Sequence, residues 1–279
     1  MKITVGVPSR NRPLDLAAAI LALDKTKSFG HQVDYIVGLD TDDLVTIEVA
    51  ENLKTRLPIT MSIADRGIGL GEIHNRMTAA ADPDAVFLLW SDRIVPCLEH
   101  WDHALAMAAM QFANRVLWMD SIHLVGAGQF ALPPQWRKAM PCPPCPGYFP
   151  FWFEDTWVEE VDHYVHGMPR IASYAKCAGP RTAKTTRMRE LPFWIEFYQF
   201  CLPMRLEEAK RIAENLGVIP QDNKELVNHF SNRMADMLAR KDVLTEMFGG
   251  GGEPDESYLR AKAHAEAIMA DRVPGRAFA

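Results

Sequence analysis

Apolar and polar positions in the first 120 residues predict strands that alternate with helices. Short apolar runs stop at polar residues, and most are followed by apolar residues at helical spacing. The expected strands are Ile3–Val7, Tyr35–Leu39, Ile59–Ile63, Ala85–Trp90 and Arg115–Met119. Runs that are apolar on both faces and alternate with helices predict an α/β fold, with a mostly parallel central sheet flanked by helices.

Two later segments have a different pattern. The stretch from Gly126 to Pro150 is rich in proline, glycine and aromatic residues, which predicts a long structured loop over the sheet. After Leu191 the pattern is helical only, over 191–216 with an interruption at Pro203, then over 223–248 and 255–271. We therefore expect an α/β domain over 1–190 and an α-helical C-terminal extension over 191–279.

Composition indicates an ordinary globular protein. Of the 279 residues, 48% are hydrophobic and 24% are charged, which excludes fibrous and wholly disordered classes. Five cysteines are too few for a disulfide framework. Charged residues interrupt the N-terminal apolar run, and no apolar stretch is long enough to span a membrane, so we expect a cytoplasmic protein without an integral membrane segment.

Charge adds two observations. The formal net charge of −6 argues against a surface built wholly for nucleic acid. A local basic run nevertheless lies between Arg170 and Arg189, with no acidic residue in it.

Ligands of parallel sheets bind beyond the carboxyl ends of the strands, and here those ends carry residues 8–12, 40–43 and 91–93. We therefore expect the residues that bind ligands and catalyse a reaction to lie at these three turns.

Five segments within the first 165 residues form an ordered set of motifs. They are ITVGVPSRNRP at 3–13, IVGLD at 36–40, RGIGLGEIHNR at 66–76, FLLWSDRIVP at 87–96 and WFEDTW at 152–157. In order and spacing they resemble the motifs of family 2 glycosyltransferases with the GT-A fold. The resemblance implies an enzyme that moves a sugar from a nucleotide-diphosphate donor to an acceptor hydroxyl. The expected partners are therefore the nucleotide-diphosphate sugar and the acceptor. Two positions depart from the family pattern: Trp90 replaces the first acid of the D-x-D motif, and Arg10 replaces a tyrosine.

The resemblance also implies a donor site and a divalent metal, Mn²⁺ or Mg²⁺. The residues expected to bind the donor are Pro8, Arg10, Asn11, Arg12, Asp40, Asp42, Asn75, Arg76, Ser91 and Arg93. Asp92 is the expected metal ligand, and His166 is a candidate for a second one. Departure of the diphosphate builds negative charge, so the basic residues Arg181, Lys184 and Arg187 are expected to contact it.

The reaction also needs a base, because the acceptor hydroxyl must lose a proton as it attacks the anomeric carbon. Asp155 is the first candidate and Glu154 the second, since both lie among aromatic residues that create a partly apolar cleft. In-line attack would invert the anomeric configuration. Tyr148 and Trp152 are expected to stack against the acceptor.

Several alternatives stay open from the sequence. A nucleotidyltransferase that forms nucleotide sugars would need a glycine-rich loop after the first strand, where this chain has none. A non-catalytic nucleotide-sugar-binding protein is favoured by Trp90. The acceptor can be a glycan, a lipid-linked sugar or a modified DNA base, because aromatic residues beside a basic run also suit flipped nucleotides. The C-terminal helices can mediate a homo-oligomer.

Overall fold

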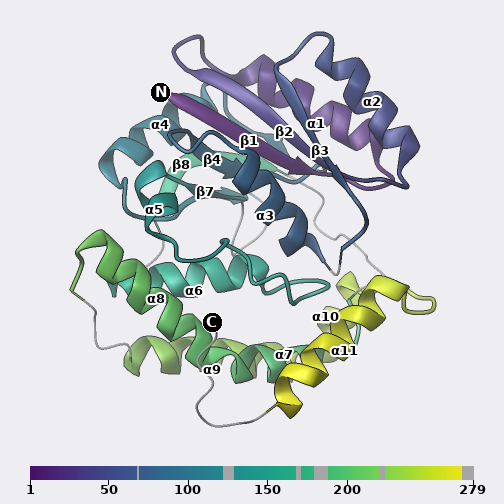
Figure 1. The fold of residues 1–279 in the computed structure, drawn as a ribbon, viewed down its shortest axis with the longest axis vertical. Helices are drawn as coiled ribbons and strands as arrows, with labels where there is room; N and C mark the ends of the chain where they lie inside the picture. The colour runs from purple at the N-terminus through teal and green to yellow at the C-terminus, as the bar shows by residue number, and fades with distance from the viewer. Residues whose placement is uncertain (68, 122–128, 168–170, 179–187, 220–223, 272–279) are drawn as a thin grey trace.

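The computed structural model describes residues 1–67, 69–121, 129–167, 171–178, 188–219 and 224–271, and within them the strands form a single mixed sheet (Figure 1). The strands are β1 (Lys2–Pro8), β2 (Gln32–Asp40), β3 (Ile59–Ala64), β4 (Val86–Leu89), β5 (Val95–Pro96), β6 (Leu117–Ser121), β7 (Gln129–Leu132) and β8 (Ile171–Ala178). Their order across the sheet is β3-β2-β1-β4-β7-β6-β8-β5.

Parallel pairing dominates the half of the sheet that matters for ligand binding. β1 pairs in parallel with both β2 and β4, and β2 pairs in parallel with β3. The register sets Pro8 opposite Gly38, and Gly6 opposite Leu89. The carboxyl ends of β1, β2 and β4 therefore reach the same edge of the sheet, which confirms the predicted α/β architecture.

Helices cover both faces of the sheet. They are α1 (Pro13–Thr26), α2 (Leu44–Lys54), α3 (Leu70–Ala80), α4 (Trp101–Gln111), α5 (Pro134–Ala139), α6 (Glu154–His166), α7 (Leu191–Phe200), α8 (Leu202–Leu216), α9 (Lys224–Ala239), α10 (Lys241–Phe248) and α11 (Glu256–Ala270). α1 and α4 pack Leu16, Ile20 and Leu105 on one face, in an apolar cluster with Val5 and Val37 of the sheet. α3 and α6 contribute to the cluster on the opposite face.

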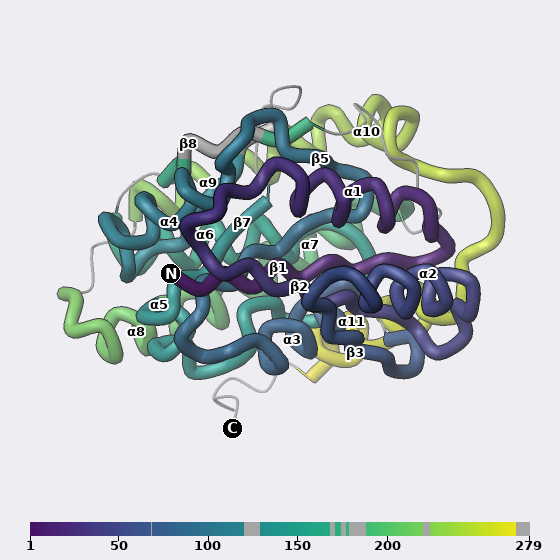
Figure 2. Tube along the Cα trace, turned by 90° about the horizontal axis from the view of Figure 1, so that it is seen from above, coloured from purple at the N-terminus to yellow at the C-terminus, as the bar shows by residue number. Residues whose placement is uncertain are grey.

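A further layer of helices packs on the outer side of α6, away from α1 and α2 (Figure 1). One apolar cluster contains residues of α3 and α6 together with residues of α7, α8, α9 and α11, so it extends across the expected boundary at 190/191. The segment that joins α10 to α11 runs along one side of the molecule and returns α11 toward β3 (Figure 2). None of the helices in the described ranges has the length and apolar character needed to cross a bilayer.

α6 lies between these layers and is buried on nearly every side. Three of its five acidic residues are paired with arginines from three different segments. Arg115, just before β6, bonds Asp162 with Nη2–Oδ2 at 2.7 Å, and Arg205 of α8 bonds Glu160 with Nε–Oε2 at 2.8 Å. Arg233 of α9 pairs with Glu159 at 2.8 Å. Burial of these carboxylates is tolerated because each is paired, and the pairs fix α6 between the sheet and the helical layer.

The expectation of one long loop over 126–150 was wrong for the residues that the structure describes. β7 lies between β4 and β6 and pairs antiparallel with both, and α5 follows it directly. Pro134 is the first residue of α5, where a missing amide hydrogen costs nothing, and Pro133 precedes it as the N-cap. Residues 140–150 carry no helix or strand. The predicted helix over 223–248 is divided at Arg240 into α9 and α10.

Candidate active site

A cleft of about 510 Å³ lies at the carboxyl ends of β1, β2 and β4. Its walls come from the loop after β1, from the turn after β4, from the loop before α3, from β7 and from the start of α6. The charged residues that line it are Arg10, Arg12, Arg66, Asp40, Asp92, Glu154, Asp155 and Asp255. Residues far apart in the sequence thus meet in one concave site.

Arg10 connects the loop after β1 with the end of β2. Its guanidinium donates to Asp40 Oδ2 at 2.7 Å and to both carboxylate oxygens of Asp42, at 2.6 and 2.8 Å. These hydrogen bonds raise the pKa of Arg10 and lower the pKa of Asp42. Asp40 is only 2% exposed, and its buried Oδ1 has no hydrogen-bond partner among the described residues. One acceptor in the cleft wall therefore remains for a ligand.

The backbone of the same loop is set by Asn11. Asn11 has a φ of 53°, a left-handed conformation that asparagine tolerates better than most residues. Its amide donates to Asp43 Oδ2 at 2.6 Å, and the other oxygen of Asp43 accepts the amide of Thr46 at the start of α2. Asp43 therefore acts as a helix cap that also fixes the loop after β1.

Asp92 follows β4 and is held from two sides. Ser9 donates its hydroxyl to Asp92 Oδ2 at 2.9 Å, and Arg12 Nη1 lies 3.2 Å from Oδ1. Burial raises the pKa of Asp92, and the charge of Arg12 opposes the rise. Trp90 is fully buried in the apolar cluster on the α1 face, and its indole donates to the carbonyl of Ile94. Only one carboxylate of a D-x-D arrangement is thus present here.

The fit of these residues to a divalent metal depends on that single carboxylate. Within the described residues no group of three or more His, Cys, Asp or Glu side chains is placed to hold a metal ion. The Asp92 carboxylate is nevertheless an oxygen ligand of the kind that Mg²⁺ and Mn²⁺ prefer, and Mg²⁺ commonly takes few protein ligands. Asp92 therefore suits a cation that completes its coordination with phosphate oxygens and water.

The start of α6 places two carboxyl groups in the cleft wall. Trp152 and Phe153, which precede it, have φ values of 58° and 66°, an unfavourable conformation for aromatic residues. Phe153 is held in it by stacking on Tyr198, with ring centroids 4.8 Å apart. The chain thereby turns sharply before Glu154 and Asp155, and both side chains line the cleft.

The two carboxyl groups have different surroundings. Glu154 is buried, and neither of its oxygens accepts a hydrogen bond of normal geometry among the described residues; burial raises its pKa to about 8, although the amides of Gly147 and Phe149 partly oppose this. Asp155 is half-buried, and its Oδ1 accepts the amide of Thr156 at 2.8 Å. Burial raises the pKa of Asp155 as well, and the Thr156 amide lowers it. At neutral pH Glu154 is therefore mainly protonated.

Several residues of the cleft were not predicted from the sequence. Arg66 lines it and pairs through Nη2 with Asp255 Oδ2 at 2.6 Å, and Asp255 caps α11 by accepting the amide of Tyr258. His74 also lines the cleft, and burial lowers its pKa to about 3, so the ring is neutral. An aspartate directly before a helical pattern predicts a helix cap, so the capping role of Asp255 could have been predicted from the sequence. Its pairing with Arg66, which lies far away in the chain, could not.

The structure brings seven of the ten predicted donor residues near one another, and it uses the other three elsewhere. Pro8, Arg10, Asn11, Arg12, Asp40 and Ser91 line the cleft, and Asp42 joins them through Arg10. Asn75 instead bonds the backbone of Cys145, and Arg76 contacts the carbonyls of Leu39 and Ser62. Arg93 lies 3.8 Å from Asp15.

The predicted acceptor and metal residues are divided in the same way. Trp152 lines the cleft, whereas Tyr148 packs against Phe197 and His264. His166 lies at the far end of α6, roughly 18 Å from its start at 1.5 Å per residue. Its Nε2 lies 2.9 Å from the carbonyl of Asn114, so the structure does not bring it to Asp92. Arg181, Lys184 and Arg187 lie outside the described residues.

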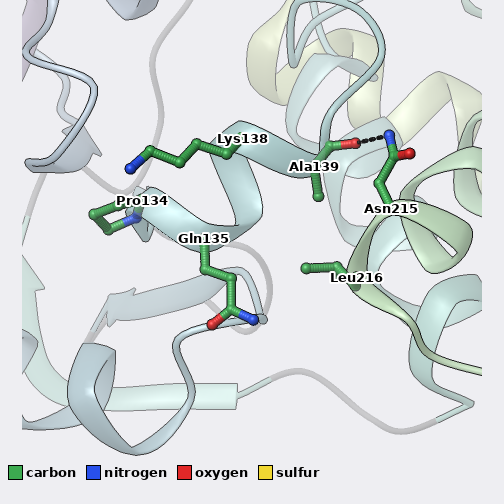
Figure 3. A pocket seen from close by; sticks show the side chains of 6 residues that line it. All are labelled: Pro134, Gln135, Lys138, Ala139, Asn215 and Leu216. Carbon is green, nitrogen blue, oxygen red and sulfur yellow. Dashed lines mark hydrogen bonds between the residues drawn. The ribbon is translucent and has the colours of Figure 1, made fainter.

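A second hollow, of about 460 Å³, lies between α5 and α8 (Figure 3). It is lined by Pro134, Gln135, Lys138, Ala139, Asn215 and Leu216. Asn215 donates to the carbonyl of Ala139 at 2.8 Å and joins the two helices. Lys138 is the one ionisable residue in this lining, so the hollow lacks the paired carboxylates and arginines of the cleft.

Comparison with known proteins agrees with this arrangement. No family model and no curated protein matches the chain. Residues 1–349 of S. aureus TarS, solved in complex with UDP, superpose with a TM-score of 0.54 at 15% identity, covering 96% of this chain and 83% of that one. GalNAc-T7 with UDP, GalNAc and Mn²⁺ gives a TM-score of 0.55 at 9% identity, covering 86% and 58%.

The likeness extends over only part of the longer neighbours. A longer TarS chain matches with a TM-score of 0.52 at 14% identity, covering 77% of this chain, which spans 43% of that chain's length. These neighbours are glycosyltransferases, and the shared feature is the central sheet with its flanking helices. The protein therefore has the GT-A fold found in these nucleotide-sugar-dependent glycosyltransferases.

Proposed function

We propose that the protein transfers a sugar from a nucleotide-diphosphate donor to an acceptor hydroxyl. The observation that carries this proposal is the meeting, in one cleft, of the ends of β1, β2 and β4 with the carboxyl groups at the start of α6. The fold is that of glycosyltransferases solved with UDP, which supports a nucleotide donor here. A cleft of about 510 Å³ is large enough for such a ligand.

The nucleoside would bind beside Arg10 and Asp40. Asp40 Oδ1 is a buried acceptor that lacks a partner among the described residues, so a base that donates an N–H group would satisfy it. Uracil and guanine both carry a ring N–H of this kind. The Arg10 guanidinium is held flat between Asp40 and Asp42 and offers a planar surface for a base, in place of the family's tyrosine.

The diphosphate would enter a cleft that is rich in acidic groups. Three arginines face five acidic residues among those that line it, and with Glu154 protonated the acids still outnumber the arginines, so an anionic donor needs added positive charge. Mn²⁺ or Mg²⁺ bound at Asp92 would neutralise the charge that develops on the leaving diphosphate. Arg12 lies beside Asp92, and we place Arg181, Lys184 and Arg187 as further phosphate-binding candidates.

Asp155 would act as the base. The acceptor oxygen attacks the anomeric carbon, the bond from that carbon to the diphosphate oxygen breaks, and the electron pair leaves with the diphosphate. The acceptor proton passes to the Asp155 carboxylate. Asp155 suits this role because it is half-buried in the cleft wall, whereas Glu154, with a pKa of about 8, is already protonated at neutral pH. Attack opposite the leaving group would invert the anomeric configuration.

The acceptor would stack on the aromatic residues before α6. Phe151 and Trp152 line the cleft, and their rings stack with centroids 5.1 Å apart. Such a surface suits the apolar face of a sugar ring, so we propose the hydroxyl of a glycan or of a lipid-linked sugar as the acceptor. A modified DNA base would use the same aromatic surface, and transfer to hydroxymethylated oligonucleotides tests for it.

The experiment is transfer from a panel of UDP-, GDP- and dTDP-sugars to saccharide and oligonucleotide acceptors, with Mn²⁺ or Mg²⁺ present. We expect Asp155→Asn to lose about 10²–10⁴-fold in turnover while it still binds the nucleotide, because only proton transfer is removed. Glu154→Gln is the matched control and should keep turnover. Full activity of Asp155→Asn would contradict the assignment of the base. Pyrophosphate release from a nucleoside triphosphate would instead indicate a nucleotidyltransferase.

One observation favours a second function. Trp90 is fully buried at the position of the first D-x-D acid, which leaves a single carboxylate for a metal. A non-catalytic protein that only binds nucleotide sugars needs no more than one carboxylate at this position. Nucleotide-sugar binding in calorimetry without turnover of any acceptor would support that function over transfer.

A further inference from the structure

Arg12 and Asp92 form an ion pair at the only D-x-D acid that this chain has retained. The pair joins Arg12 Nη1 to Asp92 Oδ1 at 3.2 Å, and Ser9 Oγ donates to Oδ2 at 2.9 Å. Both oxygens of Asp92 are therefore engaged, and the carboxylate is only 4% exposed. The negative charge of Asp15 also raises the pKa of Asp92, and the Asp15 carboxylate lies 3.8 Å from the guanidinium of Arg93.

These contacts make the cleft a poor site for a divalent cation that arrives alone. The cation would meet one carboxylate whose charge is already balanced by Arg12. It would also gain no second acidic ligand at position 90, because Trp90 is buried in the apolar cluster. A hard cation held by one neutralised carboxylate keeps most of its water and binds weakly.

A diphosphate changes both conditions. It brings several negatively charged oxygens that can coordinate the cation, and it offers Arg12 a second anionic partner. The Arg12 side chain is 42% exposed, so it has room to move from Asp92 toward an incoming phosphate. Asp92 Oδ1 is then available to the cation.

We propose that Arg12 makes divalent-cation binding depend on the nucleotide diphosphate: the ion pair with Asp92 keeps the cation out of the empty cleft and opens when cation and diphosphate enter together. The inference rests on the proposed function for the nature of the donor. The ion pair and the single carboxylate are properties of this chain's own residues. Arg12 is a positioning residue here, since it acts on the cation through Asp92.

The test measures Mn²⁺ binding directly, as the decrease in the electron paramagnetic resonance signal of unbound Mn²⁺. Wild-type protein is titrated with Mn²⁺ alone and with UDP or GDP, and Mn²⁺ bound by the nucleotide in solution is measured separately and subtracted. We expect at least about tenfold tighter binding with the nucleotide. Without nucleotide, Arg12→Gln should bind Mn²⁺ about fivefold more tightly than wild type, because the competing charge is gone.

Three further variants make the result specific. Arg12→Lys keeps the charge and should retain the dependence on nucleotide. Arg211→Gln removes an arginine from an exposed ion pair on α8 and should behave as wild type. Asp92→Asn should lose Mn²⁺ binding with and without nucleotide, and retained binding would overturn the role of Asp92.

The outcomes separate this inference from the proposed function. Equal Mn²⁺ affinity of the wild type with and without a bound nucleotide overturns the inference, and so does an unchanged affinity of a folded Arg12→Gln variant. If no nucleotide diphosphate binds, the proposed function fails, and the nucleotide-free titration of Arg12→Gln still decides whether Arg12 excludes the cation.

Discussion

Glu154 lies directly against Gly71. A Cβ atom built on Gly71 would come within 2.5 Å of Glu154 Oε1 and 2.8 Å of Oε2, so the Glu154 carboxyl group would have to move to admit any side chain there. Gly71 belongs to the first turn of α3, and Glu154 is the first residue of α6. A Cβ on Gly69 would overlap with the carbonyl oxygen of Phe149. The glycines at 69 and 71 thus allow the segment before α6 to pack on the start of α3, which fixes the carboxyl groups at the cleft.

Replacing Gly69 with alanine should therefore destabilise the protein. Its new methyl group would meet backbone atoms of Phe149 and Pro150, which cannot rotate away. We expect a loss of about 2 kcal/mol or more in the free energy of unfolding, measured by urea denaturation. Gly251→Ala is the matched control, because a Cβ there meets nothing within 4 Å. Equal midpoints for the two variants would contradict the close packing at Gly69.

Restoring an acid at position 90 should not create a metal site. Trp90 is fully buried, packs in the apolar cluster and donates its indole N–H to Ile94. Trp90→Asp would leave a cavity and bury an unpaired carboxyl group, so we expect a loss of about 4 kcal/mol or more in stability. Trp90→Phe, which keeps most of the packing, should lose less. A Trp90→Asp variant that melts like wild type and binds Mn²⁺ more tightly would prove this wrong.

Much of the fold could be predicted because its signals are local. The strands β1 to β4 are apolar runs that stop at polar residues, and parallel pairing then brings Pro8, Asp40 and Asp92 to one edge. The interruption expected at Pro203 is found at Cys201, between α7 and α8, and Pro203 lies in the first turn of α8. β7 was missed because it is only four residues long and lies within a segment rich in glycine and proline. Its place is set by pairing with β4 and β6, which no local pattern reveals.

The site was predicted less completely for a similar reason. A motif gives the residues that lie near a ligand, but it does not give the partner of each side chain. Asn75 and Arg76 follow the glycine loop as expected, yet their polar groups bond backbone atoms of other segments. The pair of Arg66 with Asp255 joins residues 189 positions apart in the chain. Such contacts exist only once α11 has packed on the loop after β3.

Asp40 and Asp42 provide a matched pair for testing the nucleoside site. Both accept hydrogen bonds from Arg10, but Asp40 is buried and its Oδ1 has no partner among the residues that the structure describes, whereas the side chain of Asp42 is 60% exposed. Asp40→Asn should weaken UDP or GDP binding about tenfold, since a charge-assisted hydrogen bond to the base is lost. Asp42→Asn should change it by no more than about twofold, because exposed ion pairs contribute little. Calorimetry on both variants decides, and equal losses would contradict the role of Asp40.

Glu154 should make the stability of the protein depend on pH. Burial holds its pKa at about 8 in the folded state, against 4.5 for an ordinary glutamate. Between these values the folded protein keeps a proton that the unfolded chain releases, so the stability should fall as the pH rises from about 4.5 to about 8. Glu154→Gln cannot ionise and should gain on the order of 5 kcal/mol over wild type at pH 9, with little difference at pH 4.5. Thermal melts across this range give the comparison, with the exposed Glu207→Gln as the control. A difference between Glu154→Gln and wild type that stays constant with pH would show that Glu154 ionises normally in the folded protein.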